Sequence, residues 1–192
     1  MPRSGVRVGV ADHLGWAVAV TATAEHAVAD RRRIELVGPG LSAAPIHYDR
    51  GRLDDAAAAA LVRSVRNSAL RASAAALDEL AAALPMPVVS ISLRDWPPDF
   101  PEDIAVQRRA PYEARADAIM YRQVLAAVAH ERGWAIHRYD AKTVEAQAAE
   151  RLGERAGQIL RGPRATLGPP WNQDHRMALA ATVMARATPP RT

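Results

Sequence analysis

Three side chains of different chemistry follow one another at the start of the last predicted helix: Asp174, His175 and Arg176. Asp174 has a plain structural explanation, because an acid in the first turn of a helix meets the positive end of the helix dipole, here with Asn172 as the N-cap. The same dipole favours the ionised carboxylate, which is the form that binds Mg²⁺. Asp174 is therefore a candidate helix-stabilising residue and also a candidate metal ligand.

His175 and Arg176 each allow two interpretations as well. Because neighbouring residues on a helix project about 100° apart, Asp174 and His175 reach one ion only if the helix start is distorted. This geometry favours a packing role for His175 over a metal-binding role. Arg176 suits a phosphate, but it suits an ion pair with a nearby acid equally well.

The stretch RRAPYEARADAIMYRQ (108–123) interleaves arginine with tyrosine on a predicted loop and helix. Basic side chains beside aromatic ones suit a nucleic-acid backbone with unstacked bases. A solvated helix face with two partly buried tyrosines is the alternative, and the sequence favours it. The nucleic-acid hypothesis assigns the contacts to Arg108, Arg109, Arg115, Arg122 and Tyr112.

Several enzyme classes lack their residues in this chain. There is no cysteine, which excludes thiol catalysis, disulfides and cysteine zinc sites. The histidines show no HxxxH or HExxH spacing, and no P-loop, GxGxxG or GxSxG motif occurs. The sequence therefore indicates neither a zinc protease nor the commonest nucleotide-binding and hydrolase families.

The basic residues are almost all arginine, with Lys142 as the only lysine, and the net charge is +4 with a pI near 10.1. Arginine binds phosphate well, because its planar fork donates two parallel hydrogen bonds. An Ala-, Arg- and Pro-rich composition is also what GC-rich codon usage produces, and +4 is a modest field for nucleic acid at this length. Codon usage is the favoured explanation of the composition.

Hydrophobic patterning predicts a single domain over residues 1–187 and a flexible tail at 188–192. The first three strands are expected to be antiparallel, and a long helix with apolar residues every three or four positions follows them. The predicted elements are strands at 6–11, 16–23, 28–37, 88–93 and 134–139, and helices at 53–84, 113–132 and 172–187, with shorter helical segments before the last helix.

This order predicts an α/β fold with a five-stranded mixed sheet, in which three antiparallel strands precede the αβ units and helices flank the sheet. Strands 6–11 and 88–93 are the most continuously apolar, so we expect them to be parallel neighbours at its centre. The Pro-Pro-Trp turn at 169–171 restricts the chain before the last helix. We therefore expect Asp174 to face the end of the first strand.

The order of elements, with one acid ending the first strand and another opening the last helix, resembles the ribonuclease H-like fold. The segments VGVADHLGWAVAV, VLAAVAHERGWAIHRYDAKTVEAQAAERLG and DHRMALAATVM are similar to parts of Holliday-junction resolvases of the RuvC type. In that family four acids hold two divalent ions, which activate water and stabilise the leaving oxygen of a phosphodiester. The resemblance implies Mg²⁺ or Mn²⁺ as the cofactor.

By position, the resemblance makes Asp12 the acid of the first strand and Asp174 the first acid of the last helix. Asp12 precedes a His13-Leu14-Gly15 turn, so the alternative is that it simply forms the turn. If Asp12 holds a cation, Asp12→Asn is expected to leave stability equal or slightly higher, because the change relieves repulsion in the metal-free protein.

The other two acids of the family pattern are missing in place. Ser90 or Ser92 stands where the fourth strand would carry a glutamate, and Met177 falls at the position of the fourth acid. The resemblance leaves Asp95, just beyond the fourth strand, and His175 as substitute ligands. The expected metal ligands are therefore Asp12, Asp174 and His175, with Asp95 as a further catalytic acid.

Two classes of function are open at this point. The first is a metal-dependent phosphodiesterase, a nuclease or resolvase acting on structured DNA or RNA. The second is a ribonuclease H-like module that has lost catalysis and has a binding or structural role. No apolar stretch predicts a signal peptide or a membrane span, so the expected location is the cytoplasm. A homodimer is compatible with both classes.

Overall fold

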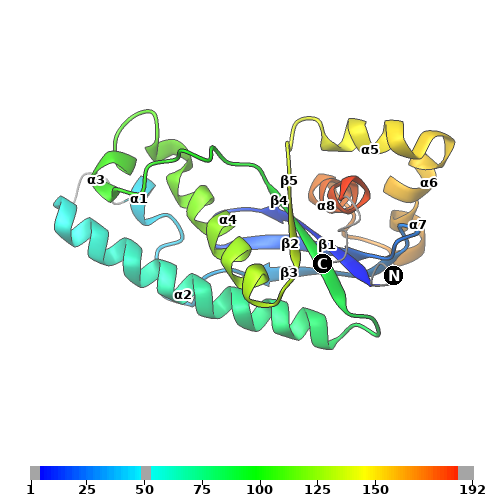
Figure 1. Ribbon diagram of the computed structural model, residues 1–192, viewed down its shortest axis with the longest axis horizontal. Coiled ribbons are helices and arrows are strands. Elements are labelled where there is room, and N and C mark those ends of the chain that lie inside the picture. Colours follow the sequence, from blue (N-terminus) through cyan, green and yellow to red (C-terminus); the bar gives the residue numbers. More distant parts are fainter. Residues whose placement is uncertain (1–4, 49–52, 186–192) are drawn as a thin grey trace, which may run out of the picture.

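The computed structural model describes residues 5–48 and 53–185, which form one five-stranded sheet with helices on both faces (Figure 1). The strand order is β3-β2-β1-β4-β5. This arrangement confirms the predicted mixed sheet, whereas the predicted domain end at 187 and the tail at 188–192 lie outside the described residues. The strands are β1 (Val6–Asp12), β2 (Trp16–Ala22), β3 (Val28–Glu35), β4 (Val88–Arg94) and β5 (Ala135–Tyr139).

Strand direction changes at the middle of the sheet. β1, β2 and β3 are antiparallel, while β4 runs parallel to β1 and β5 runs parallel to β4. The first hairpin turns at Gly15, whose φ of +80° suits glycine, and the His13 N–H donates to the Trp16 carbonyl at 2.8 Å. β1 and β4 are therefore central and parallel neighbours, as their apolar sequences predict.

The two faces of the sheet carry separate hydrophobic clusters. On one face, Val6, Val8 and Val10 pack with α2 (Asp55–Ala82) and α4 (Glu113–Glu131). The other face is covered by α5 (Val144–Leu152) and α8 (Gln173–Met184). Figure 1 shows these two pairs of helices on opposite sides of the sheet.

Helix α8 crosses β1 at very close range. A methyl group at Gly9 would lie 1.8 Å from the carbonyl oxygen of Ala178, so the crossing requires glycine. Asp174 is one turn before Ala178 on the helix, and Asp12 is three residues after Gly9 on the strand. The close crossing therefore places the first turn of α8 beside the end of β1.

The start and the end of α2 are explained by simple sequence signals, and the helices not yet named are short. The side chain of Asp54 caps α2 by accepting from the Ala57 N–H at 2.7 Å, and α2 ends just before Pro85 and Pro87. No helix in the described part of the chain is long and apolar enough to cross a membrane. The short helices are α1 (Pro45–Tyr48), α3 (Ile104–Gln107), η1 (Gly153–Arg155), α6 (Ala156–Leu160) and α7 (Pro163–Leu167).

Candidate functional site

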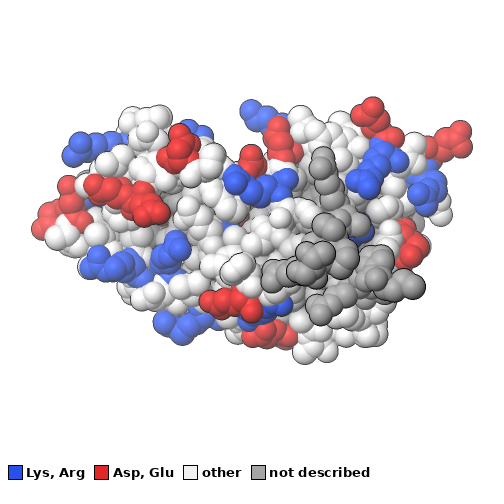
Figure 2. Space-filling view, viewed as in Figure 1, with Lys and Arg blue, Asp and Glu red and all other residues white. Residues whose placement is uncertain are grey.

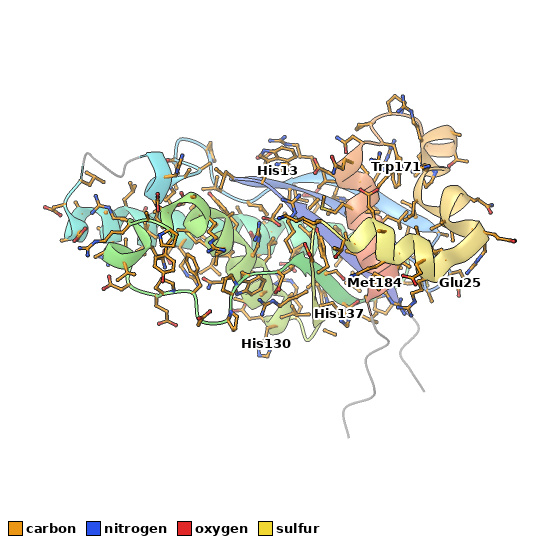
Figure 3. All side chains as sticks on the ribbon, turned by 90° about the horizontal axis from the view of Figure 1, so that it is seen from above. His13, Glu25, His130, His137, Trp171 and Met184 are labelled. Carbon is orange, nitrogen blue, oxygen red and sulfur yellow. The ribbon has the colours of Figure 1, made fainter. Side chains whose placement is uncertain are left out.

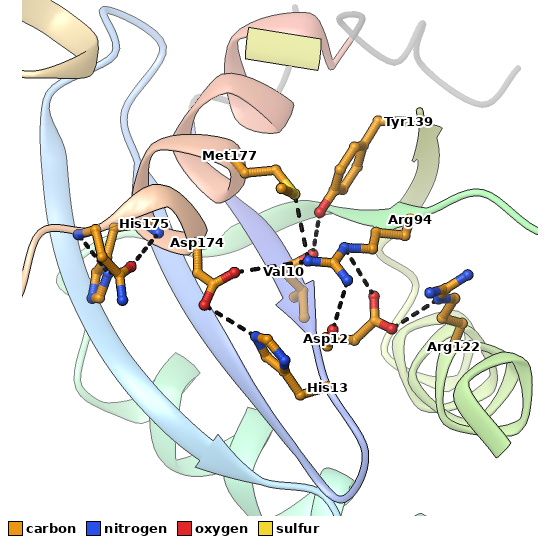
Figure 4. Close-up of polar contacts among 10 residues, drawn as sticks. Val10, Asp12, His13, Arg94, Arg122, Tyr139, Asp174, His175 and Met177 are labelled. Atoms are coloured by element: carbon orange, nitrogen blue, oxygen red, sulfur yellow. Dashed lines mark hydrogen bonds and ion pairs between the residues drawn. The ribbon is translucent and has the colours of Figure 1, made fainter. Parts of the chain in front are cut away.

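Asp12 is the last residue of β1, and its carboxylate is paired with arginine from two other elements (Figure 4). Nε of Arg122, on α4, donates to Asp12 Oδ2 at 2.8 Å. Nε of Arg94, the last residue of β4, lies 3.7 Å from Asp12 Oδ1. Asp12 itself is only 2% exposed, so this charge is compensated by arginine within the protein rather than by water.

Asp174 points from the first turn of α8 towards the same place. The helix is capped by Asn172, whose side chain accepts from the His175 N–H at 3.3 Å, as the sequence predicts for Asn172. Asp174 instead pairs with His13 Nε2 at 3.0 Å, and its other oxygen lies 3.8 Å from a terminal nitrogen of Arg94. Asp174 is thus directed at the end of β1, as expected, and side chains outside α8 bind its carboxylate.

Two contacts fix the entry of α8. Trp171 is buried, and its indole N–H donates to the Leu160 carbonyl at 2.9 Å. Arg31 on β3 donates to the carbonyls of Leu167 and Gly168 at 2.6 and 2.8 Å. In Figure 3, His13 and Trp171 mark the start of α8 and Met184 marks its far end. The turn before the helix is therefore anchored to the end of α6 and to β3, which sets the direction of Asp174.

Arg94 is the residue that sequence reasoning missed. It ends β4, donates to the backbone carbonyl of Asp12 at 2.9 Å and lies between the two carboxylates. Ser90 and Ser92, at the expected position of a strand-four acid, are buried, and the Ser92 hydroxyl donates to the Ala181 carbonyl. The only signal in the sequence was a charged residue closing an apolar strand.

Asp95 does not join the carboxylates of Asp12 and Asp174. Its side chain is 60% exposed and pairs with Arg138 of β5, while its backbone carbonyl accepts from Arg122 at 3.0 Å. The Arg138 guanidinium also lies over the ring of Trp96, 4.2 Å from its centre. Asp95 therefore helps to order the arginines around the site, with its carboxylate facing Arg138.

His175 and Arg176 are held by neighbours other than the paired acids. His175 is buried, its Nδ1 is 2.7 Å from the Asn172 side-chain oxygen, and its ring packs near Trp171. Burial lowers the pKa of His175, and the nearby Arg31 lowers it further. Arg176 pairs with Glu145 on α5 at 3.2 Å. The structure thus agrees with a packing role for His175 and an ion-pair role for Arg176.

The arginines and tyrosine of the 108–123 stretch lie in different surroundings. Arg108 is bound to the Asp55 carboxylate, and the Tyr112 ring meets Phe100 edge-on at 5.7 Å. Arg122 belongs to the Asp12 site. Of these five residues, Arg109 and Arg115 are exposed and the other three are partly buried. The stretch therefore does not form one continuous surface of free cations.

Aromatic and basic side chains stack beside the paired acids. The ring of His13 stacks on Trp16, with ring centres 4.1 Å apart and planes 9° apart. The guanidinium of Arg33 lies 3.9 Å from the centre of the Trp16 ring. Burial raises the pKa of Tyr139, so its hydroxyl stays protonated and donates to the Val10 carbonyl at 2.7 Å.

The residues present do not fit the metal site that the fold resemblance implies. Within residues 5–48 and 53–185, no three His, Cys, Asp or Glu side chains gather in a way that could hold a metal ion. Asp12 and Asp174 do come together, but a guanidinium stands between them. His175 and Asp95, the substitute ligands, are directed at other partners.

Comparisons with known proteins support the fold. No family model and no curated protein sequence matches the chain. It is similar to the solved structure of T. thermophilus RuvC in complex with Holliday junction substrate, with a TM-score of 0.54 and 11% identity over 93% of this chain and 90% of that one. A second Thermus thermophilus RuvC structure matches with a TM-score of 0.53 and 11% identity, over 93% and 91% of the two chains. The chain therefore has a ribonuclease H-like fold near that of RuvC.

Proposed function

We propose that this ribonuclease H-like protein binds the phosphate backbone of structured DNA or RNA at the ends of β1 and β4, and does not cleave it. One observation carries the proposal: the guanidinium of Arg94 lies between the carboxylates of Asp12 and Asp174. Metal-dependent cleavage needs such carboxylates as ligands of the ions that activate water. In this chain, arginine already compensates their charge.

Two arginines on the acids, Arg94 and Arg122, and Arg138 on the neighbouring Asp95 have further N–H groups that a ligand can bind. A guanidinium carries five N–H donors, and the bonds from Arg122 to Asp12 and to the Asp95 carbonyl use only some of them. The side chains of Arg94, Arg122 and Arg138 are 19%, 17% and 35% exposed. Since planar guanidinium groups bind phosphate through paired hydrogen bonds, this end of the sheet suits a nucleic-acid backbone.

Helix α4 extends the basic surface away from the acids. Arg115 is seven residues before Arg122 on the same helix, so the two side chains project from the same face about two turns apart. Arg109 is exposed just before the helix. A backbone bound at Arg122 would pass Arg115 and Arg109, which keeps part of the 108–123 stretch in the proposed interface.

The fold comparison suggests which nucleic acid to test. Trp16 already stacks on His13 and is covered by Arg33, and Trp96 is covered by Arg138, so the proposal rests on phosphate contacts and not on base stacking. The similar RuvC structure is described as a complex with Holliday junction substrate. A four-way junction, which combines a dense phosphate backbone with an open centre, is therefore the first ligand to test.

A nuclease using Mg²⁺ or Mn²⁺ is the second candidate. It is favoured by the position of Asp12 at the end of β1 and Asp174 at the start of α8, because both carboxylates lie near the side chain of Arg94. In that mechanism Arg94 would have to leave the acids before ions bind. Cleavage of a junction therefore separates the two candidates.

Binding can be measured by fluorescence anisotropy with a labelled four-way junction, a duplex of the same sequence and a single strand, all in EDTA. The proposal predicts preferred binding of the junction, weakened by Arg138→Ala. Arg71→Ala, which removes the same charge from an exposed position on α2, is the matched control and should bind like the wild type. Equal or absent binding of all three nucleic acids would contradict the proposal.

A further inference from the structure

The carboxylates of Asp12 and Asp174 come from different elements and meet one guanidinium. Nε of Arg94 is 3.7 Å from Asp12 Oδ1, and a terminal nitrogen is 3.8 Å from Asp174 Oδ1. The other terminal nitrogen donates to the Asp12 carbonyl at 2.9 Å. Two carboxylates and a backbone carbonyl are also the oxygen ligands that a hard divalent ion takes.

We propose that Arg94 is the resident cation of this site, in the place that a divalent ion would take, and that removing its guanidinium makes the site bind Mn²⁺ or Mg²⁺. The inference rests on the proposed function for the non-catalytic role of the acids. It concerns only the protein and metal ions, so its test involves no nucleic acid.

The charges around Arg94 already balance. Two carboxylates, of Asp12 and Asp174, face two guanidinium groups, of Arg94 and Arg122. A divalent ion beside Arg94 would meet positive charge at contact distance. Because Asp12 is almost fully buried and both arginines are largely covered, water and salt screen this repulsion poorly. The wild-type site should therefore exclude divalent ions.

Neighbouring elements keep the Arg94 guanidinium in place. Arg94 pairs with Tyr139 in the parallel register of β4 and β5, which holds its backbone at the end of the sheet. A terminal nitrogen of Arg94 lies 3.5 Å from Sδ of Met177, one turn after Asp174 on α8. Met177 stands at the position of the fourth acid of RuvC-type resolvases. It contacts the Arg94 guanidinium and carries no negative charge that could bind a metal ion.

Mn²⁺ titration of the purified protein, with free Mn²⁺ followed by electron paramagnetic resonance, tests the inference. Wild type should show no saturable binding. Arg94→Ala should bind one ion, and Arg94→Glu should bind it more tightly because it adds a third carboxylate. We expect Arg94→Glu to bind Mn²⁺ about ten- to a hundredfold more tightly than Arg94→Ala, the range over which groups around a metal site change its affinity. The melting temperature of both variants should rise with Mn²⁺.

Arg138→Ala is the matched control, because it removes a neighbouring arginine that pairs with Asp95 and not with Asp12 or Asp174. It should bind no Mn²⁺, and adding Asp12→Asn to Arg94→Ala should abolish the gained site. Wild-type binding of one Mn²⁺ that Asp12→Asn removes would overturn the inference. Folded Arg94→Ala and Arg94→Glu proteins that bind no more Mn²⁺ than Arg138→Ala would also overturn it.

Circular dichroism covers the case in which an Arg94 variant unfolds in EDTA. Recovery of the folded spectrum on adding Mn²⁺ would support the inference, because the ion would then replace the missing cation. A variant that stays unfolded in Mn²⁺ would count against it. If the wild type does not bind a junction, by contrast, only the proposed function is contradicted, and the Mn²⁺ test of Arg94 still stands.

Discussion

Asp12 is 2% exposed, and a carboxylate buried this far is stable only when nearby cations compensate its charge. Arg122 supplies a direct hydrogen bond from α4, and Arg94 a longer ion pair from β4. Arg94 also connects Asp12 to Asp174, which His13 holds from the other side. The site is therefore a chain of opposite charges, in which each group depends on its neighbours.

Asp12→Asn should lower the free energy of unfolding by about 2 kcal/mol, because it leaves two largely covered guanidinium groups with less negative charge. This reverses the expectation from the sequence, which assumed a cation-holding acid in a metal-free protein. Denaturant unfolding measures the change. Asp95→Asn is the control, since its carboxylate is 60% exposed, and it should alter stability by about 0.5 kcal/mol or less. Equal stability of Asp12→Asn and wild type would contradict the ion-pair account.

Three histidines with lowered pKa values should make the stability of the protein depend on pH. Burial lowers the pKa of His26, His137 and His175 from the ordinary value of 6.5. Below that value the unfolded chain binds protons that the folded protein does not, so the free energy of unfolding falls as the pH decreases. The stabilisation is complete above about pH 6.5 and is lost as the pH passes down through the lowered folded-state pKa values.

Unfolding curves between about pH 7.5 and about pH 5.5 test this sign. His137→Gln should flatten the dependence, because the buried Nε2 of His137 has no hydrogen-bond partner to compensate protonation. His130→Gln changes an exposed histidine and serves as the control. Stability that rises towards acid pH would show that these three histidines do not determine the dependence.

Single residues were predicted from the sequence where a family resemblance or local geometry placed them. The expectation that Asp174 faces the end of the first strand rested on the resemblance to RuvC-type resolvases and on the Pro-Pro-Trp turn, and the packing role of His175 followed from helix geometry. Arg94 did not, because its place between the acids depends on the register of β4 against β1, which includes an irregularity. No local pattern contains that register.

At the scale of elements, the crossing of α8 over β1 positions Asp174. The Ala178 carbonyl lies where a side chain at position 9 would begin, and Trp171 and Arg31 anchor the chain just before the helix. The strands and long helices were predictable, because their hydrophobic periods are local properties of the sequence. The close crossing was not, since a glycine in a strand does not reveal which element approaches it.

Gly9→Ala should destabilise the protein by about 3 kcal/mol, because its methyl group would overlap the Ala178 carbonyl and force α8 away from the sheet. Thermal unfolding measures the effect. Gly157→Ala is the matched control: a methyl there meets nothing within 4 Å, and the residue lies in α6. That change should be neutral or stabilise by up to about 1 kcal/mol. A neutral Gly9→Ala would contradict the close crossing.

At the scale of the whole molecule, positive and negative side chains are interspersed over the face in Figure 2, without one large basic patch. This distribution agrees with the modest net charge of +4. A net charge this small favours nucleic-acid binding through a few positioned arginines over binding through a broad basic surface. The fold itself was predictable as a whole, because the order of strands and helices permits few sheet topologies.

The double variant Arg109→Ala/Arg115→Ala should weaken junction binding and leave stability unchanged, since both side chains are exposed. If each arginine neutralises one phosphate, the slope of log affinity against log salt concentration should fall by about 2. Arg63→Ala/Arg71→Ala on the exposed side of α2 is the charge-matched control. If the slope of log affinity against log salt concentration is unchanged, Arg109 and Arg115 do not belong to the proposed interface.

The central claim is that arginine pairs with the carboxylates of Asp12 and Asp174, and that the protein binds nucleic acid without cleaving it. The most direct test is to incubate the wild type with an end-labelled four-way junction in Mg²⁺ and in Mn²⁺. Products are resolved on a denaturing gel, with Asp12→Asn and Asp174→Asn in parallel. We predict that the junction is bound and stays intact with all three proteins. Symmetrical cleavage by the wild type that both variants abolish would contradict the account and identify the protein as a metal-dependent nuclease.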